Sequence, residues 1–306
     1  MMYDIIVVGG GPAGLTAALY SVRAGKSVLV LEKANYGGQM ALSPRIENYL
    51  GFSEISGCEL TELILEQVET AGAELLDEEV FSISEKDKIK TVKTEMGEYQ
   101  SKAVIIATGM RHKLLGVKHE NEYSGNGISY CAACDGAFYK DKCVAVVGGG
   151  NSAVQEALYL CDICKSVTVM QNLPSLTAEN KLCEQLEKRE NVRFLFNTVI
   201  TEFTGDGKKL TGVIAENTDT KTISELTFDG VFVAIGLEAD NDIFKGLITL
   251  DNENFILSDD EMKTDRDGIF TAGDCRSKKI RQITTAMADG TTAAFSACKY
   301  VDELNK

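Results

Sequence analysis

Two cysteines near the middle of the chain have the residue types and the spacing that disulfide chemistry needs. Cys131 and Cys134 are separated by two alanines, and Asp135 and Gly136 follow directly. CxxC spacing allows the two sulfurs to close a small disulfide loop, and it lowers the pKa of one thiol. The neighbouring Asp135 carboxyl could act as general acid and base for the departing thiolate. The pattern predicts a redox-active pair with Cys131, Cys134 and Asp135 as its candidate catalytic residues.

Two glycine-rich segments repeat in the same register. Residues 7–20 read VVGGGPAGLTAALY, and residues 146–159 read VVGGGNSAVQEALY. Each segment follows an apolar strand and opens a helix, which is the pattern of a βαβ dinucleotide-binding unit. The first glycine permits a tight turn, the second lets the backbone approach a pyrophosphate at the helix N-terminus, and the third small residue allows close packing. These positions are Gly9, Gly11 and Gly14 in the first copy and Gly148, Gly150 and Ala153 in the second.

The residue that closes the second strand of each copy bears on which nucleotide binds. In the first copy it is Glu32, whose carboxylate can accept hydrogen bonds from ribose hydroxyls, as in FAD or NAD. In the second copy it is Gln171, and residues 171–177 contain no lysine or arginine. A 2′-phosphate carries close to two negative charges and needs cationic partners. The second copy is therefore not expected to select NADPH tightly.

A second pair, Cys161 and Cys164, has the same spacing as the first, and with nine cysteines in the chain spacing alone is weak evidence. Four thiolates could also bind zinc. The first pair lies between two nucleotide-binding units, where electrons could pass between a nucleotide and the disulfide. We therefore assign the redox role to the first pair and interpret Cys161 and Cys164 as packing residues or unpaired thiols. The chain has only two histidines, His112 and His119. We predict no metal site.

The elements that position these residues follow from the hydrophobic pattern. Residues 103–109 and 230–236 are apolar and end in a small residue and glycine, which is typical of buried parallel strands. Residues 58–71 have helical spacing, and residues 268–274 form another strand before a turn. We predict an α/β fold with two Rossmann-like, three-layer ββα dinucleotide-binding domains, the second inserted into the first. The first domain would comprise residues 1–112 and 243–306, and the second residues 116–240.

Composition excludes several classes of protein. Among 306 residues, 46 are acidic and 31 basic, and the net charge of −15 disfavours nucleic acid and anionic membranes as partners. No apolar run reaches the ~18 residues that span a bilayer. The N-terminus has neither the basic region nor the cleavage site of a signal peptide. We expect a cytoplasmic protein with no nucleic-acid or membrane partner.

With these motifs in place, the chain resembles the low-molecular-weight thioredoxin reductases over nearly its whole length. The resemblance rests on eight motifs: residues 9–14 (GGGPAG), 37–39 (GGQ), 47–49 (ENY), 107–109 (ATG), 131–136 (CAACDG), 148–153, 273–274 (GD) and 281–282 (RQ). It implies that the first domain and the C-terminal segment bind FAD. It also implies a homodimer whose inserted domain rotates, so that the cysteine pair meets flavin and thioredoxin in turn.

The resemblance assigns roles to individual residues. Cys134 would face the flavin, Cys131 would attack the disulfide of thioredoxin, and Asp135 would donate the proton. Gln39 and Asn48 would line the isoalloxazine. Asp274 would meet the ribityl and phosphate region, with Arg281 and Gln282 at the flavin edge. The cofactor-binding residues expected altogether are Gly9, Gly11, Pro12, Ala13, Gly14, Glu32, Lys33, Gly38, Gln39, Asn48, Thr108, Gly109, Gly273, Asp274, Arg281 and Gln282.

The chain departs from this family where most members bind NADPH. The arginines of the family's HRRxxxR motif fall on Asn172, Leu173 and Thr177. In this it resembles the ferredoxin-dependent flavin thioredoxin reductases, in which reduced ferredoxin supplies the electrons. Ferredoxins are acidic, as this chain is, so docking would need a basic patch. The candidate patch is Arg276, Lys278, Lys279 and Arg281, with an ordinary solvated loop as the alternative.

The favoured function is therefore a flavin-dependent thioredoxin-disulfide reductase whose electron donor is ferredoxin. One alternative keeps the enzyme but uses NADH or NADPH as the hydride donor. Another is a flavin-binding, redox-sensing interaction module with regulatory cysteines, against which the complete CxxCDG motif argues. A ferredoxin–NADP reductase on the same scaffold would not need the cysteine pair.

Overall fold

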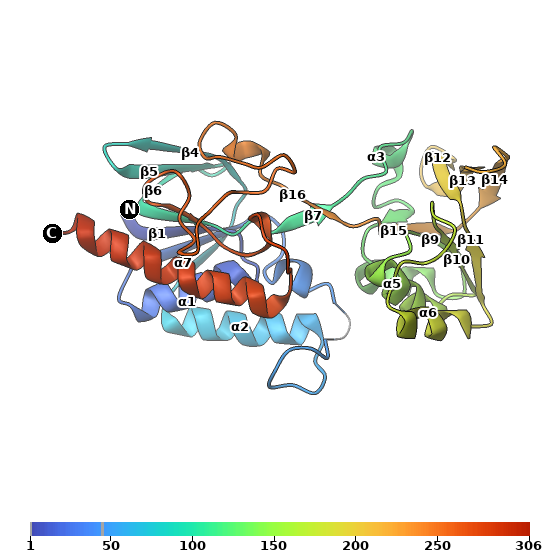
Figure 1. Ribbon diagram of the computed structural model, residues 1–306, viewed down its shortest axis with the longest axis horizontal. Coiled ribbons are helices and arrows are strands. Elements are labelled where there is room, and N and C mark those ends of the chain that lie inside the picture. The colour runs from blue at the N-terminus through green and yellow to red at the C-terminus, as the bar shows by residue number, and fades with distance from the viewer. Residues whose placement is uncertain (1, 44–45) are drawn as a thin grey trace. The chain divides into compact units, whose positions relative to one another are not determined.

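The chain folds into two compact units, one inserted into the other. A computed structural model describes residues 2–43 and 46–306. Unit 1 holds the residues up to Arg111 together with Glu238–Lys306, and unit 2 holds His112–Leu237. In Figure 1 the blue and red ends of the chain belong to unit 1, and the green and yellow middle belongs to unit 2. These boundaries lie close to those expected from the sequence.

Unit 1 is built around a mixed sheet. Its strands run in the order β3-β2-β1-β6-β5-β4, with β17 also pairing with β6. Strand β1 pairs in parallel with β2 and β6, whereas β4, β5 and the start of β6 are antiparallel. The elements are β1 Met2–Val8, α1 Pro12–Arg23, β2 Val28–Glu32, η1 Gly38–Met40, α2 Gly57–Ala71, β3 Glu74–Asp77, β4 Val80–Lys86, β5 Ile89–Thr94, β6 Glu98–Ile106, η3 Asp242–Phe244, β17 Ile269–Thr271, η4 Gly273–Cys275 and α7 Ile283–Leu304.

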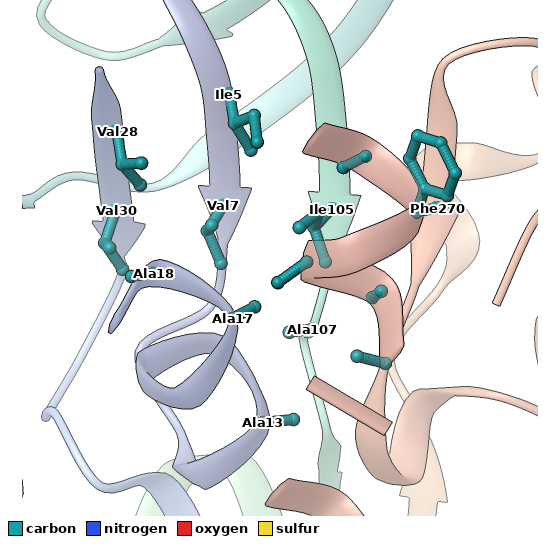
Figure 2. Close-up of a cluster of buried hydrophobic side chains, with 14 of the residues drawn as sticks. Ile5, Val7, Ala13, Ala17, Ala18, Val28, Val30, Ile105, Ala107 and Phe270 are labelled. Carbon is teal, nitrogen blue, oxygen red and sulfur yellow. The ribbon is translucent and has the colours of Figure 1, made fainter. Parts of the chain in front are cut away.

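The sheet of unit 1 is buried on both faces, which is why its central strands are continuously apolar. Alternate residues of β1 point to opposite sides: Ile5 and Val7 belong to one core cluster, and Ile6 and Val8 to another. Figure 2 shows the first cluster, in which Ile5 and Val7 lie among side chains of the neighbouring strands and the alanines of α1. The helix α7 packs beside α1, where a Cβ at Gly290 would lie 2.2 Å from the Ala13 carbonyl oxygen. Small residues therefore allow these two helices to lie close together over the sheet.

Unit 2 repeats this plan on a smaller scale. Its parallel sheet has the order β11-β10-β9-β15-β8, and β12, β13 and β14 form a separate antiparallel sheet. The segment β9–α5–β10 reproduces β1–α1–β2, as the repeat predicts. The elements are α3 Glu120–Tyr123, β8 Ile128–Ser129, α4 Ala132–Asp135, η2 Gly136–Tyr139, β9 Cys143–Val147, α5 Asn151–Cys161, β10 Ser166–Met170, α6 Asn180–Glu187, β11 Val192–Leu195, β12 Thr198–Gly205, β13 Leu210–Asn217, β14 Ile223–Thr227 and β15 Gly230–Val233.

The chain passes between the units through two short strands, β7 (Met110–His112) and β16 (Leu237–Ala239), which pair with each other. The predicted fold class, with two Rossmann-like domains of sheet, sheet and helix layers, is confirmed. Of the helices in the described part of the chain, none combines the length and apolar character that a membrane-spanning segment requires.

Candidate active site

The predicted cysteine pair forms a disulfide on a one-turn helix. The sulfurs of Cys131 and Cys134 are bonded, and Cys131 is the N-cap of α4, where its sulfur accepts a hydrogen bond from the Cys134 amide at 3.1 Å. The hydroxyl of Ser129 accepts from the Cys131 amide at 3.0 Å. Cys134 is exposed and Cys131 is half-buried. The sequence between the cysteines thus folds locally into a turn that brings the two sulfurs together.

The turn is held against helix α5 by two small residues. Ala132 is buried in the core of unit 2 together with Ala157 and Leu160 of α5. A Cβ at Gly136 would lie 2.9 Å from the ring of Tyr159, so only glycine allows this approach. The glycine of the CxxCDG motif is therefore explained by packing.

The second CxxC pair lies in the core. Cys161 is the last residue of α5, Cys164 lies just after that helix, and both are free thiols buried in the core of unit 2. Burial raises the pKa of each thiol to about 11, so both are protonated at neutral pH. This agrees with packing as their role. Within residues 2–43 and 46–306 no cluster of side chains suitable for a metal ion is found.

The glycine-rich turn of unit 1 has the geometry of a phosphate cradle. Gly9 has φ +108°, and a Cβ there would meet the Ala107 carbonyl oxygen at 2.3 Å. A Cβ at Gly14 would lie only 1.9 Å from the Gly9 oxygen, whereas a Cβ at Gly11 would meet nothing within 4 Å. The first turn of α1 carries no side-chain cap. Gly9 and Gly14 are thus required for packing, and Gly11 leaves open space beside uncapped helix amides, where an anion is favoured.

Glu32 ends strand β2, Lys33 follows it, and both make contacts within the protein. The Glu32 carboxylate accepts hydrogen bonds from the amides of Gly10 at 2.7 Å and Ala34 at 2.9 Å. This fixes the carboxylate beside the glycine-rich turn, where a ribose-binding acid is needed. Lys33 instead pairs with Asp240 at 2.7 Å.

Further predicted residues converge on the same turn from distant parts of the chain. A Cβ at Gly38 would lie 3.6 Å from the Cα of Gly11. A Cβ at Gly273 would lie 2.7 Å from the Cβ of Ala13. Asn48 donates a hydrogen bond to the side-chain oxygen of Gln282 at 3.1 Å.

The remaining predicted residues of unit 1 lie in η1, at the start of α1 and in the loop after β6. Gln39 makes a long contact of 3.5 Å to the Met110 carbonyl, and Thr108 donates to Asn241 at 3.1 Å. Gly109 has φ +67° and faces open space. Pro12 is the first residue of α1, where its missing N–H costs no helical hydrogen bond.

Asp289 on α7 organises the loop after β17 and is absent from the sequence prediction. Its carboxylate accepts from the Gly273 amide at 3.2 Å, from Arg276 at 3.0 Å and from Lys278 at 2.8 Å. Although burial raises the pKa of Asp289, hydrogen bonds from the two cations outweigh this and hold it below its usual range. The feature of the sequence that could have indicated this role is an acidic residue within an alanine-rich face of a helix.

This network corrects the predicted basic patch. The side chains of Arg276 and Lys278 are only 17% and 8% exposed, and both form ion pairs with Asp289. The guanidinium of Arg281 lies over the ring of Phe255 at 4.2 Å. Of the four cations only Lys279 is exposed. They do not form a free docking surface, because three of them bind within their own domain.

Polar atoms left without partners test whether a dinucleotide fits unit 1. Asp274 Oδ1 and Arg281 Nε are buried and have no hydrogen-bond partner among the described residues. Burial raises the pKa of Asp274, with Lys278 and Arg281 opposing that rise. A buried acceptor and a buried donor without partners are costly unless a ligand satisfies them. Hydroxyl and phosphate groups would do so, and the residues present therefore fit FAD.

The second glycine-rich turn borders a cavity of about 610 Å³ in unit 2. Gln171 is buried, and its side-chain nitrogen lies 2.3 Å from where a Cβ of Gly149 would be. The amide and hydroxyl of Thr177 both donate to the Gly149 carbonyl, at 2.7 and 3.2 Å. Asn172 and Leu173 also line the cavity, and within the described part of the chain its lining includes no lysine or arginine.

Comparisons with known proteins identify the class. A sequence profile described as pyridine nucleotide-disulphide oxidoreductase matches residues 3–290. The chain belongs to this family, and its cofactor is FAD.

Individual relatives narrow the class further. The chain is 42% identical over 305 residues to the thioredoxin reductase of Listeria monocytogenes, covering 100% of this chain and 96% of that one. The Lactococcus lactis thioredoxin reductase structure, described as the FR conformation, is 41% identical with a TM-score of 0.93, covering 98% and 99%. A ferredoxin-flavin thioredoxin reductase from Clostridium acetobutylicum is 28% identical with a TM-score of 0.56, covering 100% and 99%. The expected resemblance to thioredoxin reductases is confirmed.

Proposed function

We propose that this protein is a FAD-dependent thioredoxin-disulfide reductase that takes its electrons from ferredoxin and not from NADPH. The observation that carries the choice of donor is the cavity beside the second glycine-rich turn. It keeps the shape of a dinucleotide site, but Asn172, Leu173 and Thr177 supply no positive charge there. A 2′-phosphate transferred from water to this cavity would lose hydration without gaining a cationic partner.

Unit 1 is proposed to hold FAD, which supplies the pair of electrons that reduces the disulfide. The turn from Gly9 to Gly14 would cradle the pyrophosphate, Glu32 would meet the adenosine ribose, and Asp274 would accept hydrogen bonds from the ribityl chain. The Oδ1 atom of Asp274, which is buried without a hydrogen bond and lies 3.8 Å from the Lys278 ammonium, supports this assignment. The others proposed to contact the cofactor are Lys33, Gly38, Gln39, Asn48, Thr108, Gly109, Gly273, Arg281 and Gln282.

Cys131, Cys134 and Asp135 are proposed to carry the chemistry in unit 2. Two electrons and one proton convert the Cys131–Cys134 disulfide into a thiolate at Cys131 and a thiol at Cys134. The Cys131 thiolate then attacks the disulfide of thioredoxin, forming a mixed disulfide and releasing one thioredoxin thiolate, which Asp135 protonates. Cys134 then gives its proton to Asp135 and attacks the sulfur of Cys131, which closes the original disulfide and releases the second thioredoxin thiolate to take a proton from water.

Ferredoxin is the proposed donor, although the segment 276–281 is not its docking surface as first expected. Arg276 and Lys278 of this segment pair with Asp289, and Lys279 is the cation of the segment that is exposed. The chain is less similar to the protein described as a ferredoxin-flavin thioredoxin reductase than to the thioredoxin reductases named above, so the donor proposal rests on the cavity without cations and not on the comparisons.

A homodimer is also proposed. The exposed rings of Tyr20 on α1 and Phe295 on α7 lie 5.9 Å apart and form an apolar surface suited to a second copy. Analytical ultracentrifugation of the flavin-loaded protein, with Phe295→Asp as the disrupting variant, tests it: a monomeric wild type would reject the dimer.

An anaerobic titration tests the donor. The oxidised holoprotein is mixed in turn with reduced ferredoxin, NADH and NADPH while flavin absorbance is followed, and reduction of thioredoxin is measured with each donor. We expect rapid flavin bleaching and thioredoxin reduction with ferredoxin alone. Rapid bleaching by NADPH would reject the donor assignment and favour the pyridine-nucleotide-dependent alternative.

The Cys134→Ser variant tests the other alternative. If the cysteines catalyse turnover, this variant keeps flavin reduction but loses thioredoxin reduction. A redox-sensing module would instead show no thioredoxin reduction in the wild type, with partner binding unchanged by the substitution.

A further inference from the structure

A carboxyl group lies directly behind the cysteine turn, on the face of α5 that packs against it. Helix α4, which carries the turn, contacts α5. Ala153, Ala157 and Leu160 of α5 are fully buried in the core that includes Ala132. Glu156 shares this face, since residues three and four apart are neighbours on a helix. An acidic residue thus occupies a position where the helix is otherwise apolar.

The Glu156 carboxyl has one contact with the turn and one oxygen without a partner. The backbone amide of Ala132, which follows Cys131, favours the charged form of the carboxyl and so lowers its pKa. Ala132 is the first residue of α4, and amides in a first helical turn have no partner within the helix. The oxygen Oε2 is buried and without a hydrogen-bond partner among the described residues. A buried carboxylate with one unpaired oxygen recovers little of the hydration that it has lost. Burying the protonated carboxyl group costs less free energy, because that group carries no charge.

We propose that Glu156 is a positioning residue for the redox pair: it holds the Ala132 amide, and its protonation is coupled to the thiolate that forms when the Cys131–Cys134 disulfide is reduced. This rests on the proposed function only in taking that disulfide as redox-active.

The coupling follows from the charges. Two electrons break the sulfur–sulfur bond, and with one proton taken up the products are a thiol and a thiolate. A thiolate on the turn of α4 and an ionised Glu156 on α5 are like charges on two elements in contact, so each disfavours the other. Reduction therefore draws a further fraction of a proton onto Glu156.

Burial raises the pKa of Glu156 to about 7, with the Ala132 amide opposing the rise, so its charge changes in the physiological range. The titratable groups on the elements packed against α5 are Cys131, Cys134 and Asp135 on the turn, Tyr139 on η2, Cys143 on β9, and Lys181, Cys183, Glu184 and Glu187 on α6. None of these is among the causes of the shift in the oxidised protein. The thiolate formed on reduction would be the new charge beside it.

The test compares Glu156→Gln with Glu184→Gln. Glutamine keeps the shape and can still accept the Ala132 hydrogen bond, but it cannot ionise. Glu184 is an exposed acid on α6 of the same unit, which makes it a matched control. Each holoprotein is reduced with dithiothreitol, desalted anaerobically and alkylated with iodoacetamide over a pH range. We expect the pKa of the reactive thiol to fall by about one unit in Glu156→Gln, as removal of a neighbouring negative charge requires, and to stay unchanged in Glu184→Gln. An unchanged thiol pKa in Glu156→Gln would overturn the proposal.

Infrared difference spectra of the wild type, reduced minus oxidised at pH 7, test the coupling without depending on whether a variant folds. We expect a gain in the protonated-carboxyl band on reduction, and no gain in Cys134→Ser, which cannot close the disulfide and so controls for the flavin. Equal bands in both would overturn the proposal. Neither experiment uses thioredoxin, ferredoxin or NADPH, so an error in the donor leaves both results intact. Failure of dithiothreitol to expose two thiols would instead overturn the redox role of the pair itself.

Discussion

Restoring positive charge to the cavity of unit 2 should restore binding of the phosphorylated nucleotide. Asn172 and Leu173 line the cavity and are exposed, so arginines there would remain hydrated and cost little to introduce. A hydrogen bond to a charged group contributes about 1.5 kcal/mol or more. Two such contacts give about 3 kcal/mol, which is on the order of a hundredfold in affinity.

The assay is isothermal titration of the FAD-loaded double variant Asn172→Arg/Leu173→Arg with NADP⁺ and with NAD⁺. We expect NADP⁺ affinity to rise by about a hundredfold while NAD⁺, which lacks the 2′-phosphate, changes little. Asn172→Gln/Leu173→Gln adds bulk without charge and is the control. An equal gain for both nucleotides would mean that the arginines act through general attraction. No gain for either would refute the argument that the missing cations prevent selective binding of NADPH.

Four further outcomes follow from the geometry of unit 1. Asp289→Ala removes the carboxylate that pairs with both Arg276 and Lys278, and urea unfolding should show a loss of about 3 kcal/mol. The pKa of Asp289 is lower in the folded protein than in the unfolded chain. The stability that its charge contributes is therefore complete above the unfolded-state pKa and is lost as the pH falls through the folded-state pKa. The difference in unfolding free energy between the wild type and Asp289→Asn should shrink in acid. A stability difference that persisted at low pH would contradict this. Gly14→Ala places a Cβ 1.9 Å from the Gly9 carbonyl oxygen, and thermal unfolding of the apoprotein should show a loss of about 1–3 kcal/mol. A Cβ at Gly11 would have no atom within 4 Å. Gly11→Ala should therefore keep apoprotein stability but bind FAD at least about tenfold more weakly by fluorescence titration; equal effects of the two substitutions on folding would show that Gly11 is structural.

Residues that act through their immediate neighbours were predictable. The disulfide of Cys131 and Cys134 needs only a turn of two residues, and a glycine-rich turn after an apolar strand needs only local backbone freedom. The repeat added a second, independent instance of the same unit, which made the inserted two-domain fold predictable as well. In each case the determining interactions lie within a few residues or along the hydrogen bonds of one βαβ unit.

Residues that act through partners distant in the sequence could not be predicted from the sequence. The cations at 276–281 look like a free basic surface in the sequence, but in the structure two of them form ion pairs with Asp289 on α7. Glu156 appears as one polar position in a helix, and its burial against the turn at Cys131 depends on how α4 packs on α5.

The sequence by itself determined which chemistry the chain can perform, since thiol, carboxyl and glycine positions carry that information in their types and spacing. Tertiary structure alone decided the electrostatic state of those groups. Charge and pKa depend on burial and on partners brought together across the fold, and neither is encoded in the residues next along the chain.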